Sequence, residues 1–414
     1  MAKSHMIPRR VTVQMSRIRG VRRLLGYGVP FEAFTRDIWL VCLSLLIGAF
    51  GEGLYFWVFP LYVRFLQADY LQLGLVFSIL FGVSGLVSLA GGFLADRFDR
   101  KKLLLIGWIL WFLSPIVYAL ADNWGQLVPG AIFWGASNIA TPAIGAYVLT
   151  SMTERKRVTS VVSFVFSAYS FAYIFAPSFG GFLAQTIGYK SLLYISALLT
   201  FASACVLLFI HSQHRSKIKI EEDVSLSQTL HEKKALWRKL LVWSIFFTVI
   251  TFFITAARSF VQVFLNEQIH LNDFYIGLFG SINFAGITLI GILMGRLGDR
   301  WRRSGAIALC LLLFAASVSS ILVVRDPTSL LVLAFLYGGS GVTGSLVVSY
   351  AGTIAPESKR ALWISIPQSL SLFASFAAPY MGGYLYTLSP YYTFIVSVVA
   401  APFLAVFALL ALKE

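Results

Sequence analysis

Charged side chains are scarce in this sequence. Asp, Glu, Lys and Arg make up 12% of its 414 residues, whereas soluble globular proteins carry about 25%. Hydrophobic residues make up 58%. A chain with so few charges cannot cover a large surface in water, so lipid is expected to be the solvent for much of it. We therefore expect a membrane protein.

Cysteine and histidine are also sparse, with three and five copies. The cysteines, Cys42, Cys205 and Cys310, all lie within apolar runs and have no spacing typical of a disulfide framework or a zinc site. No histidine lies at mid-membrane depth, so no metal centre is expected. The sequence shows neither a nucleophile–base set nor a cofactor motif. An enzyme is therefore the least favoured class, and we expect no catalytic residues and no cofactor.

The charges that are present add up to +15, which by itself is compatible with a nucleic-acid partner. Their location favours a different explanation, because they lie in the first 36 residues and between apolar runs. Basic residues at those places are typical of membrane proteins. The lipid bilayer, and not a nucleic acid, is the expected partner.

Long apolar runs fill the rest of the sequence. A helix needs about 20 apolar residues to cross the hydrocarbon core of a bilayer, and twelve runs meet that length. We expect an all-α membrane protein with twelve transmembrane helices. The expected spans are 38–65, 71–94, 103–121, 127–152, 158–185, 190–211, 239–265, 273–295, 305–324, 329–354, 361–387 and 391–412.

Basic residues set the expected orientation. With the N-terminus in the cytoplasm, only Arg64, Lys190 and Arg325 fall in loops on the far side, as the excess of Lys and Arg in cytoplasmic loops requires. Both termini are then cytoplasmic, in the inner cell membrane. The expected organisation is a basic tail (1–36), a six-helix bundle (37–211), a cytoplasmic linker (212–238) and a second six-helix bundle (239–414).

The two bundles repeat each other at an offset of about 203 residues. One such match means little, but four in the same order indicate two homologous halves. The matches are Gly92–Arg97 with Gly295–Arg300, Glu154–Arg157 with Glu357–Arg360, Leu73–Leu75 with Ile276–Leu278, and Ala176–Gly181 with Ala378–Gly383.

The loop after the second span resembles the signature of the major facilitator superfamily, Gly-x-x-x-Asp-Arg-x-Gly-Arg-Lys. The resemblance extends over about residues 36–412 and is closest to the drug/proton antiporter branch. The second signature glycine is Asp99 here, and Arg302 holds the equivalent place in the other half. Asp tolerates left-handed backbone better than most residues, so the turn is expected to survive at Asp99, whereas Arg302 puts the second loop in doubt.

The signature residues are the expected cytoplasmic gate. A carboxylate at Asp96 can bind the N-terminus of span 11 and one at Asp299 that of span 5, because helix N-termini expose unpaired N–H groups. Arg97 and Arg100 would bind carboxylates or helix-end carbonyls. The alternative is that these charges only set the topology. The gate set is Gly92, Asp96, Arg97, Arg100, Gly295, Asp299 and Arg300.

Small residues recur at four-residue spacing in spans 2, 5, 8 and 11, as close helix packing in membranes requires. Pseudosymmetry then pairs span 2 with span 11 and span 5 with span 8, and the resemblance implies the same pairs. Two Ala-Pro-x-x-Gly-Gly runs add a proline bend to this packing, and they resemble a motif of exporters. Their residues are Pro177, Gly180, Gly181, Pro379, Gly382 and Gly383.

Two ionisable residues fall within spans, Glu52 in span 1 and Arg258 in span 7. A charge at mid-span costs at least about 2.5–3.5 kcal/mol and usually serves function. The resemblance implies that spans 1, 4, 7 and 10 line a central cavity. Glu52 is then the site of proton coupling, the site that binds a cationic solute, or one member of a structural pair with Arg258.

Polar and aromatic residues at similar depth complete the expected cavity. Most aromatic side chains in a membrane protein face lipid or pack in the core, so this part of the site is the least constrained. The expected cavity residues are Tyr55, Phe56, Phe59, Asn138, Thr141, Thr251, Thr255, Gln262, Tyr337 and Ser345.

These features favour a secondary transporter that works by alternating access, most simply a proton-coupled exporter of small amphipathic or cationic compounds. Its partners are a small solute, protons and the bilayer, the proton gradient is its energy source, and a monomer is expected. Uptake of a small organic anion or sugar is the alternative within transport. A non-transporting receptor or a lipid scramblase on the same scaffold is the alternative of another class.

Overall fold

A computed structural model of the protein describes residues 34–152, 158–213, 230–300, 302–354 and 360–411. The described residues form helices and no strand. The N-terminal half contains α2 (Arg36–Phe56), α3 (Phe59–Phe65), α4 (Tyr70–Arg97), α5 (Arg100–Leu120), η2 (Trp124–Gln126), α6 (Leu127–Ser137), α7 (Ala140–Ser151), α8 (Val158–Ile187) and α9 (Tyr189–Leu207). The C-terminal half contains α10 (Leu230–Arg258), α11 (Val261–Glu267), α12 (Asp273–Arg300), α13 (Arg303–Val323), α14 (Pro327–Tyr337), α15 (Gly339–Ile354), α16 (Arg360–Leu388) and α17 (Tyr392–Ala411).

Eleven segments of the described chain are long and apolar enough to cross a membrane. They correspond to all the predicted spans except 361–387, which lies within the 29-residue helix α16. Large apolar side chains cover the outside of the bundle, for example Leu198 and Phe403, which are 67% and 73% exposed. Such a surface needs lipid around it. The protein is therefore a multi-pass membrane protein.

Polar residues at the loop boundaries start several of these helices. Asp69 accepts a hydrogen bond of 2.7 Å from the backbone of Gln72, whose side chain returns one of 2.9 Å, so α4 begins with a capping box. Thr35 caps α2 and Asp326 caps α14 in the same way, with one hydrogen bond each. These caps fix where the apolar segments begin.

The first, fourth, seventh and tenth spans are each divided into two helices. Pro60 at the start of α3 has no N–H group, which explains why α2 ends beside it. Two residues separate the end of α6 from the start of α7, and Pro142 lies in the first turn of α7. The breaks give these four spans short stretches of irregular backbone, which within a membrane is found where it is buried in protein or lines a cavity.

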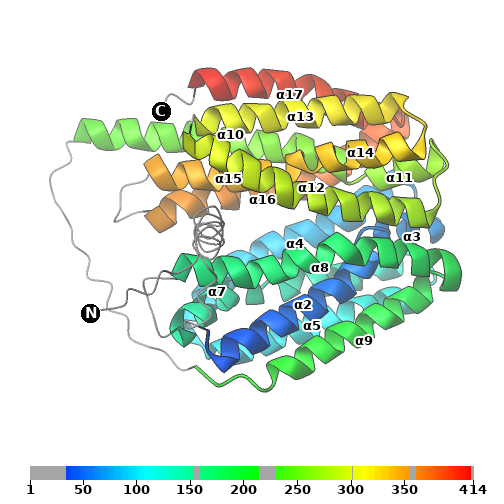
Figure 1. The fold of residues 1–414 in the computed structure, drawn as a ribbon, viewed down its shortest axis with the longest axis horizontal. Coiled ribbons are helices and arrows are strands. Elements are labelled where there is room, and N and C mark those ends of the chain that lie inside the picture. The colour runs from blue at the N-terminus through cyan, green and yellow to red at the C-terminus, as the bar shows by residue number, and fades with distance from the viewer. Residues whose placement is uncertain (1–33, 153–157, 214–229, 301, 355–359, 412–414) are drawn as a thin grey trace, which may run out of the picture.

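The two halves are separate bundles that lie side by side (Figure 1). α4 packs along α16 and α8 packs along α12, so the predicted pairing of spans 2 with 11 and 5 with 8 is confirmed. α2 begins and α17 ends on the left of Figure 1, whereas α3 and α11 lie on the right. We call the left end the signature end, because it holds the α4–α5 and α12–α13 connections, and the right end the clasp end.

The predicted basic tail and the predicted linker are described only in part. The basic tail is described only from residue 34, and 214–229 of the linker is not described. Helix α10 begins at Leu230 and continues to Arg258. The last part of the predicted linker is therefore helical and continuous with the seventh span.

Candidate transport site

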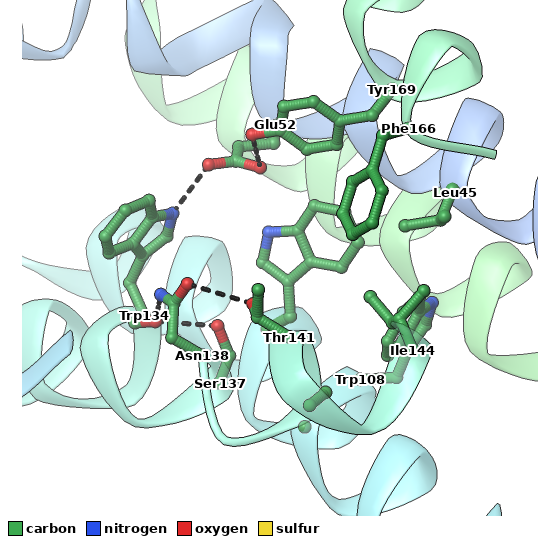
Figure 2. A pocket seen from close by; sticks show the side chains of 13 residues that line it. Leu45, Glu52, Trp108, Trp134, Ser137, Asn138, Thr141, Ile144, Phe166 and Tyr169 are labelled. Carbon is green, nitrogen blue, oxygen red and sulfur yellow. Dashed lines mark hydrogen bonds between the residues drawn. The ribbon is translucent and has the colours of Figure 1, made fainter. Parts of the chain in front are cut away.

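Glu52 lies in the last third of α2 and is buried, with 2% of its surface exposed. One carboxylate oxygen accepts a hydrogen bond of 2.8 Å from Nε1 of Trp134 on α6, and the other accepts one of 3.2 Å from the hydroxyl of Tyr169 on α8. Figure 2 shows the two donors reaching the carboxylate from two sides. Neutral donors, and not a cation, thus hold this buried acid in place.

Glycines beside Glu52 decide how α2 sits among its neighbours. A Cβ atom at Gly51 would lie 2.9 Å from Cβ of Leu199 on α9, and one at Gly53 would lie 2.7 Å from Cβ of Ala176 on α8. Both distances are shorter than real Cβ contacts, so only glycine permits this approach. α2 is fixed between α8 and α9, and that fixes the direction of the Glu52 side chain.

A central cavity of about 350 Å³ lies between the two halves, with Glu52 on its wall. Both halves contribute to the wall. The residues that matter for its chemistry are Glu52, Phe56 and Tyr169 from the N-terminal half, and Thr255, Arg258 and Gln262 from the C-terminal half. The cavity therefore combines one acid, one base and aromatic surface.

A second cavity, of about 270 Å³, lies inside the N-terminal half, and we call it the side pocket. Its wall comes from α2, α5, α6, α7, α8 and the joint between α6 and α7 (Figure 2). Glu52, Trp134 and Tyr169 line both cavities. The acid thus sits in a shared wall between two compartments.

Arg258 lies on the opposite wall of the central cavity and is partly buried at the end of α10. Among the described residues no ion pair joins it to Glu52. The two charges share a cavity, as their predicted depths suggested, but they are not a structural pair in this conformation. The buried oxygen of Gln262, one turn further along the chain, has no hydrogen-bond partner either. Both groups are available to a solute.

The other predicted cavity residues are divided between these compartments and the core. Phe56 and Thr255 line the central cavity, and Asn138 and Thr141 line the side pocket. Ser345 lines a different pocket inside the C-terminal half, together with Asp299. Thr251 is partly buried on α10, two turns before Arg258.

Three predicted cavity residues lie in the hydrophobic core instead. Tyr55, Phe59 and Tyr337 are 2%, 1% and 0% exposed. Tyr55 and Phe59 pack against Tyr118, with ring centroids 6.0 and 4.5 Å apart. Phe56 lines the central cavity while its neighbour Tyr55 packs in the core, so depth along the sequence was a poor guide to side-chain direction.

The signature end is open around its two glycines. A Cβ atom at Gly92 or at Gly295 would meet nothing within 4 Å. Arg100 donates a hydrogen bond of 3.2 Å to the carbonyl of Ala146 in the last turns of α7, and another to the hydroxyl of Thr150. Arg100 thus binds α7 within its own half, and its predicted binding to a helix-end carbonyl stays a prediction.

Contacts of Arg97 and Asp299, two further gate residues whose side chains are described, lie within one half. Arg97 lies over the ring of Phe93, 3.9 Å from its centroid, and Asp299 pairs with Arg303 at 3.5 Å within its own loop. Arg300 is exposed. The side chains of Asp96 and of the first residues of α16 lie outside the described part of the chain, so the latch between Asp96 and span 11 stays a prediction.

The two signature turns need no left-handed residue. Asp99 has φ −59° and ψ 120°, and its carboxylate accepts a hydrogen bond of 2.8 Å from the backbone of Lys101 at the start of α5. Arg302 occupies the equivalent position before α13 in extended backbone, with φ −150°. The expectation of a left-handed turn at Asp99 was wrong, and the doubt about Arg302 has no structural basis, because both residues take cap conformations open to any side chain.

The Ala-Pro-x-x-Gly-Gly runs pack the halves together near the clasp end. Pro177 and Pro379 lie within the continuous helices α8 and α16. A Cβ atom at Gly181 would collide with the backbone of α12, and one at Gly383 with the backbone of α4. Added Cβ atoms at Gly180 and Gly382 would meet the backbone carbonyls of Leu54 on α2 and Ala256 on α10. These glycines thus bring helix backbones into direct contact.

Glycine at position 277 makes the reciprocal contact and gives a clear test. A Cβ atom there would collide with the carbonyl of Pro177. We expect Gly277→Ala to push α8 and α12 apart and to cost about 1–3 kcal/mol, as overpacking does. The melting temperature of the purified protein measures the loss. Gly92→Ala is the matched control, since its Cβ meets open space, and equal melting temperatures for the two variants would contradict this account.

Arg64, Tyr70 and Glu267 join the halves at the clasp end, and we call them the clasp. Nε of Arg64 on α3 lies 2.7 Å from a carboxylate oxygen of Glu267 on α11, and the Tyr70 hydroxyl donates a 2.7 Å hydrogen bond to the other oxygen. The Arg64 guanidinium lies 4.3 Å from the centroid of the Tyr70 ring and donates to the carbonyl of Ala68. The side chains of Arg64 and Glu267 are 29% and 23% exposed.

The ion pair of the clasp joins equivalent positions of the two halves, since residues 64 and 267 differ by the repeat offset. The loops beyond them match as well, because Gln67 and His270 both have φ 62°. Equivalent residues meet where they lie close to a pseudo-two-fold axis. Opposite charges at that place close this end of the molecule.

The sequence did not single out Trp134, Tyr169 or the clasp. The first two carry N–H and O–H groups at the depth of an unpartnered acid, and a search for donors to Glu52 would have found them. The clasp had a signal in the repeat itself, because Arg64 aligns with an acid. Among the described residues, no group of three or more His, Cys, Asp or Glu side chains lies close enough to hold a metal ion.

Comparison with known proteins agrees with this architecture. The family model of the Major Facilitator Superfamily matches residues 41–264 and 248–414. The chain belongs to the major facilitator superfamily. The resemblance in the signature loop is thereby confirmed, and the protein is a membrane transporter of this superfamily.

Relatives and solved structures of the superfamily match most of the chain. "Multidrug resistance protein 2" of Bacillus subtilis is 24% identical over 87% of this chain and 91% of its own length. "Quinolone resistance protein NorA" of Staphylococcus aureus is 20% identical over 85% of this chain and 90% of its own length. A crystal structure of the nucleoside transporter NupG has a TM-score of 0.73 at 14% identity, covering 92% of this chain and all of that one. At that identity, the structural likeness shows the fold alone.

Proposed function

We propose that this protein exports small amphipathic or cationic compounds from the cytoplasm in exchange for protons. The observation that carries this proposal is Glu52, a buried acid on the wall of the central cavity that neutral donors hold without a cation. A carboxylate in that setting can bind either a proton or a cationic group of a solute. Exchange of one for the other is the chemistry of an antiporter.

The proposed topology has twelve spans and both termini in the cytoplasm, within the inner cell membrane. Helix α16 supplies the twelfth span, because it pairs with α4 as α8 pairs with α12. The signature end is then cytoplasmic, since it carries most of the basic residues. The clasp end faces the outside, and the protein acts as a monomer.

The structure has the features of a carrier open toward the cytoplasm. The clasp and the glycine contacts close one end, while Gly92 and Gly295 face open space at the other. Rocking of one half against the other would open the clasp and close the signature end. The ring of Tyr173 on α8 lies 4.7 Å from that of Phe284 on α12, so movement at this interface reaches Tyr169 and the acid beside it.

A proton can drive such a cycle because its movement is coupled to the membrane potential. One charge that crosses 100 mV is worth about 2.3 kcal/mol, or close to fiftyfold in the gradient of a solute. Aromatic side chains such as Phe56, which stacks on Trp134 with ring centroids 5.4 Å apart, suit flat apolar solutes. The names of the multidrug resistance relatives support export of such compounds.

Transport into vesicles tests the proposal. Purified protein is reconstituted in proteoliposomes and exposed to fluorescent organic cations, organic anions and sugars, under a pH gradient of either sign. We expect cations to accumulate against their gradient only when protons flow the opposite way. Movement of labelled lipid without solute would indicate a scramblase. Solute binding without any movement would indicate a receptor.

Uptake of an organic anion is a second candidate, and Arg258 favours it. Its guanidinium lines the central cavity, and no ion pair of this side chain occurs among the described residues. A bound carboxylate or phosphate would satisfy it. Accumulation of anions along with protons, lost in Arg258→Gln, would favour this candidate over export of cations.

A further inference from the structure

We propose that the side pocket is a route by which the proton of Glu52 leaves toward the signature end without passing through the central cavity. The inference rests on the proposed function, because it takes Glu52 as the group that carries the proton. It adds a division of labour between two compartments, with the solute in the central cavity and the proton in the side pocket.

The position of Glu52 is the first argument. Its carboxylate, with Trp134 and Tyr169, lines both compartments, so it can be reached from either one. The side pocket extends from there toward the signature end, along Leu45 on α2 and Ile144 on α7. In the proposed topology that is the cytoplasmic side, where an exporter must release its proton.

The lining of the side pocket is the second argument. Ser137, Asn138 and Thr141 bring hydroxyl and amide groups to it, and the Thr141 hydroxyl lies 3.4 Å from the Asn138 side-chain oxygen. A buried water molecule needs two to four polar partners, and a pocket of about 270 Å³ has room for several. Water in this pocket would connect the acid with the signature end.

The charges around Glu52 are the third argument. The titratable side chains that face it from the packed helices are Tyr55 on α2, Tyr118 on α5, and Tyr169 and Tyr173 on α8, and Arg258 lies across the central cavity. A proton that leaves through the central cavity must pass this cation. The side pocket has no basic residue on its wall, so a proton meets no such barrier there.

The composition of the two walls is the fourth argument. Both halves line the central cavity, so a solute bound there contacts the two parts that move during transport. One half alone lines the side pocket. That half can move as a rigid body, and its pocket can release a proton without changing shape.

The proton transfer itself is simple. Before release, one oxygen of the Glu52 carboxyl group carries the proton and the acid is neutral. The indole of Trp134 or the hydroxyl of Tyr169 gives up its hydrogen bond to that oxygen, since a protonated oxygen no longer accepts as a carboxylate does. When a cationic solute approaches, the acid gives its proton to a water molecule of the side pocket. That water passes a proton along the water chain to the solvent at the signature end and is neutral again.

A matched pair of variants separates the two compartments. Thr141→Leu makes the side pocket more apolar and leaves the central cavity unchanged, whereas Thr255→Leu makes the same change in the central cavity only. The probe is ethidium, a fluorescent organic cation. Its binding is measured by fluorescence on the purified protein, and proton release is followed by stopped flow with a pH indicator dye.

We expect Thr141→Leu to leave the affinity for ethidium unchanged and to slow proton release by about tenfold, because a water chain to the acid is interrupted. Thr255→Leu is expected to weaken ethidium binding and to leave the rate of proton release per bound cation unchanged. Gel filtration checks that both variants fold. Asn138→Leu is a second side-pocket variant with the same expected result.

Two results would overturn the two-compartment proposal. Weaker ethidium binding in Thr141→Leu would place the solute in the side pocket. Native behaviour of both side-pocket variants would show that protons take another route. If the unaltered protein binds ethidium and releases no proton, the proposed exchange itself fails, which is a different result from either of these.

Discussion

Glu52→Gln is expected to abolish uphill transport driven by a pH gradient and to leave downhill exchange of solute intact. Gln has nearly the shape of Glu and keeps a side-chain oxygen for the Trp134 indole, but it cannot carry a proton. The stored proton gradient, worth about 1.4 kcal/mol for each pH unit, then no longer reaches the solute. Accumulation in proteoliposomes against a solute gradient measures the loss, and counterflow of labelled solute measures the exchange.

Tyr55→Phe is the matched control for that experiment. It changes the same helix three residues away, at a buried hydroxyl that has no hydrogen-bond partner. We expect its coupling to be unchanged. Full proton-driven accumulation by the Glu52→Gln protein would refute the role of this acid.

Arg64→Glu is expected to open the clasp end, and the double change Arg64→Glu with Glu267→Arg to close it again. The single change places two carboxylates where an ion pair and the Tyr70 hydrogen bond now hold the halves. Because the pair is partly exposed, its loss is worth about 1–2 kcal/mol, and the added repulsion increases the effect. About a tenfold shift toward the outward-open state corresponds to 1.4 kcal/mol.

Accessibility of the central cavity from the clasp end measures this shift. A cysteine is placed at Gln262 in a protein whose Cys42, Cys205 and Cys310 are replaced by Ser, and a membrane-impermeant maleimide is added outside. Arg64→Glu should speed the labelling, and the charge swap should slow it again. Lys190→Glu is the control, because Lys190 pairs with Asp122 at 2.7 Å within the N-terminal half. Equal labelling in all variants would mean that the clasp does not control access.

The sequence predicted the architecture well because bilayer thickness and close packing act on local composition. Apolar run length located the helices, and small residues at four-residue spacing located the contacts of α4 with α16 and of α8 with α12. Glu52 was identified since an acid within an apolar span is costly without a role. Each of these signals lies in a short stretch of sequence.

The sequence was a weaker guide to the direction of individual side chains. Tyr55 and Phe59 lie in the core on either side of the break between α2 and α3, although their depth matches that of the cavity. Trp134 reaches Glu52 from another helix, and its direction depends on how α6 packs. The prediction of a left-handed turn at Asp99 was wrong, because Asp99 caps α5 with its side chain and does not take the left-handed conformation that favours glycine. Such features depend on tertiary packing, which no single segment encodes.

The opposite charges at positions 64 and 267 also determine which halves can assemble. If two N-terminal halves met about the same axis, Arg64 would face a second Arg64, and two C-terminal halves would bring Glu267 against Glu267. Only a pair that contains one N-terminal half and one C-terminal half gives an attractive contact. Each six-helix half therefore assembles preferentially with the other kind of half. When the two halves are expressed as separate chains, they should form pairs of one N-terminal and one C-terminal half.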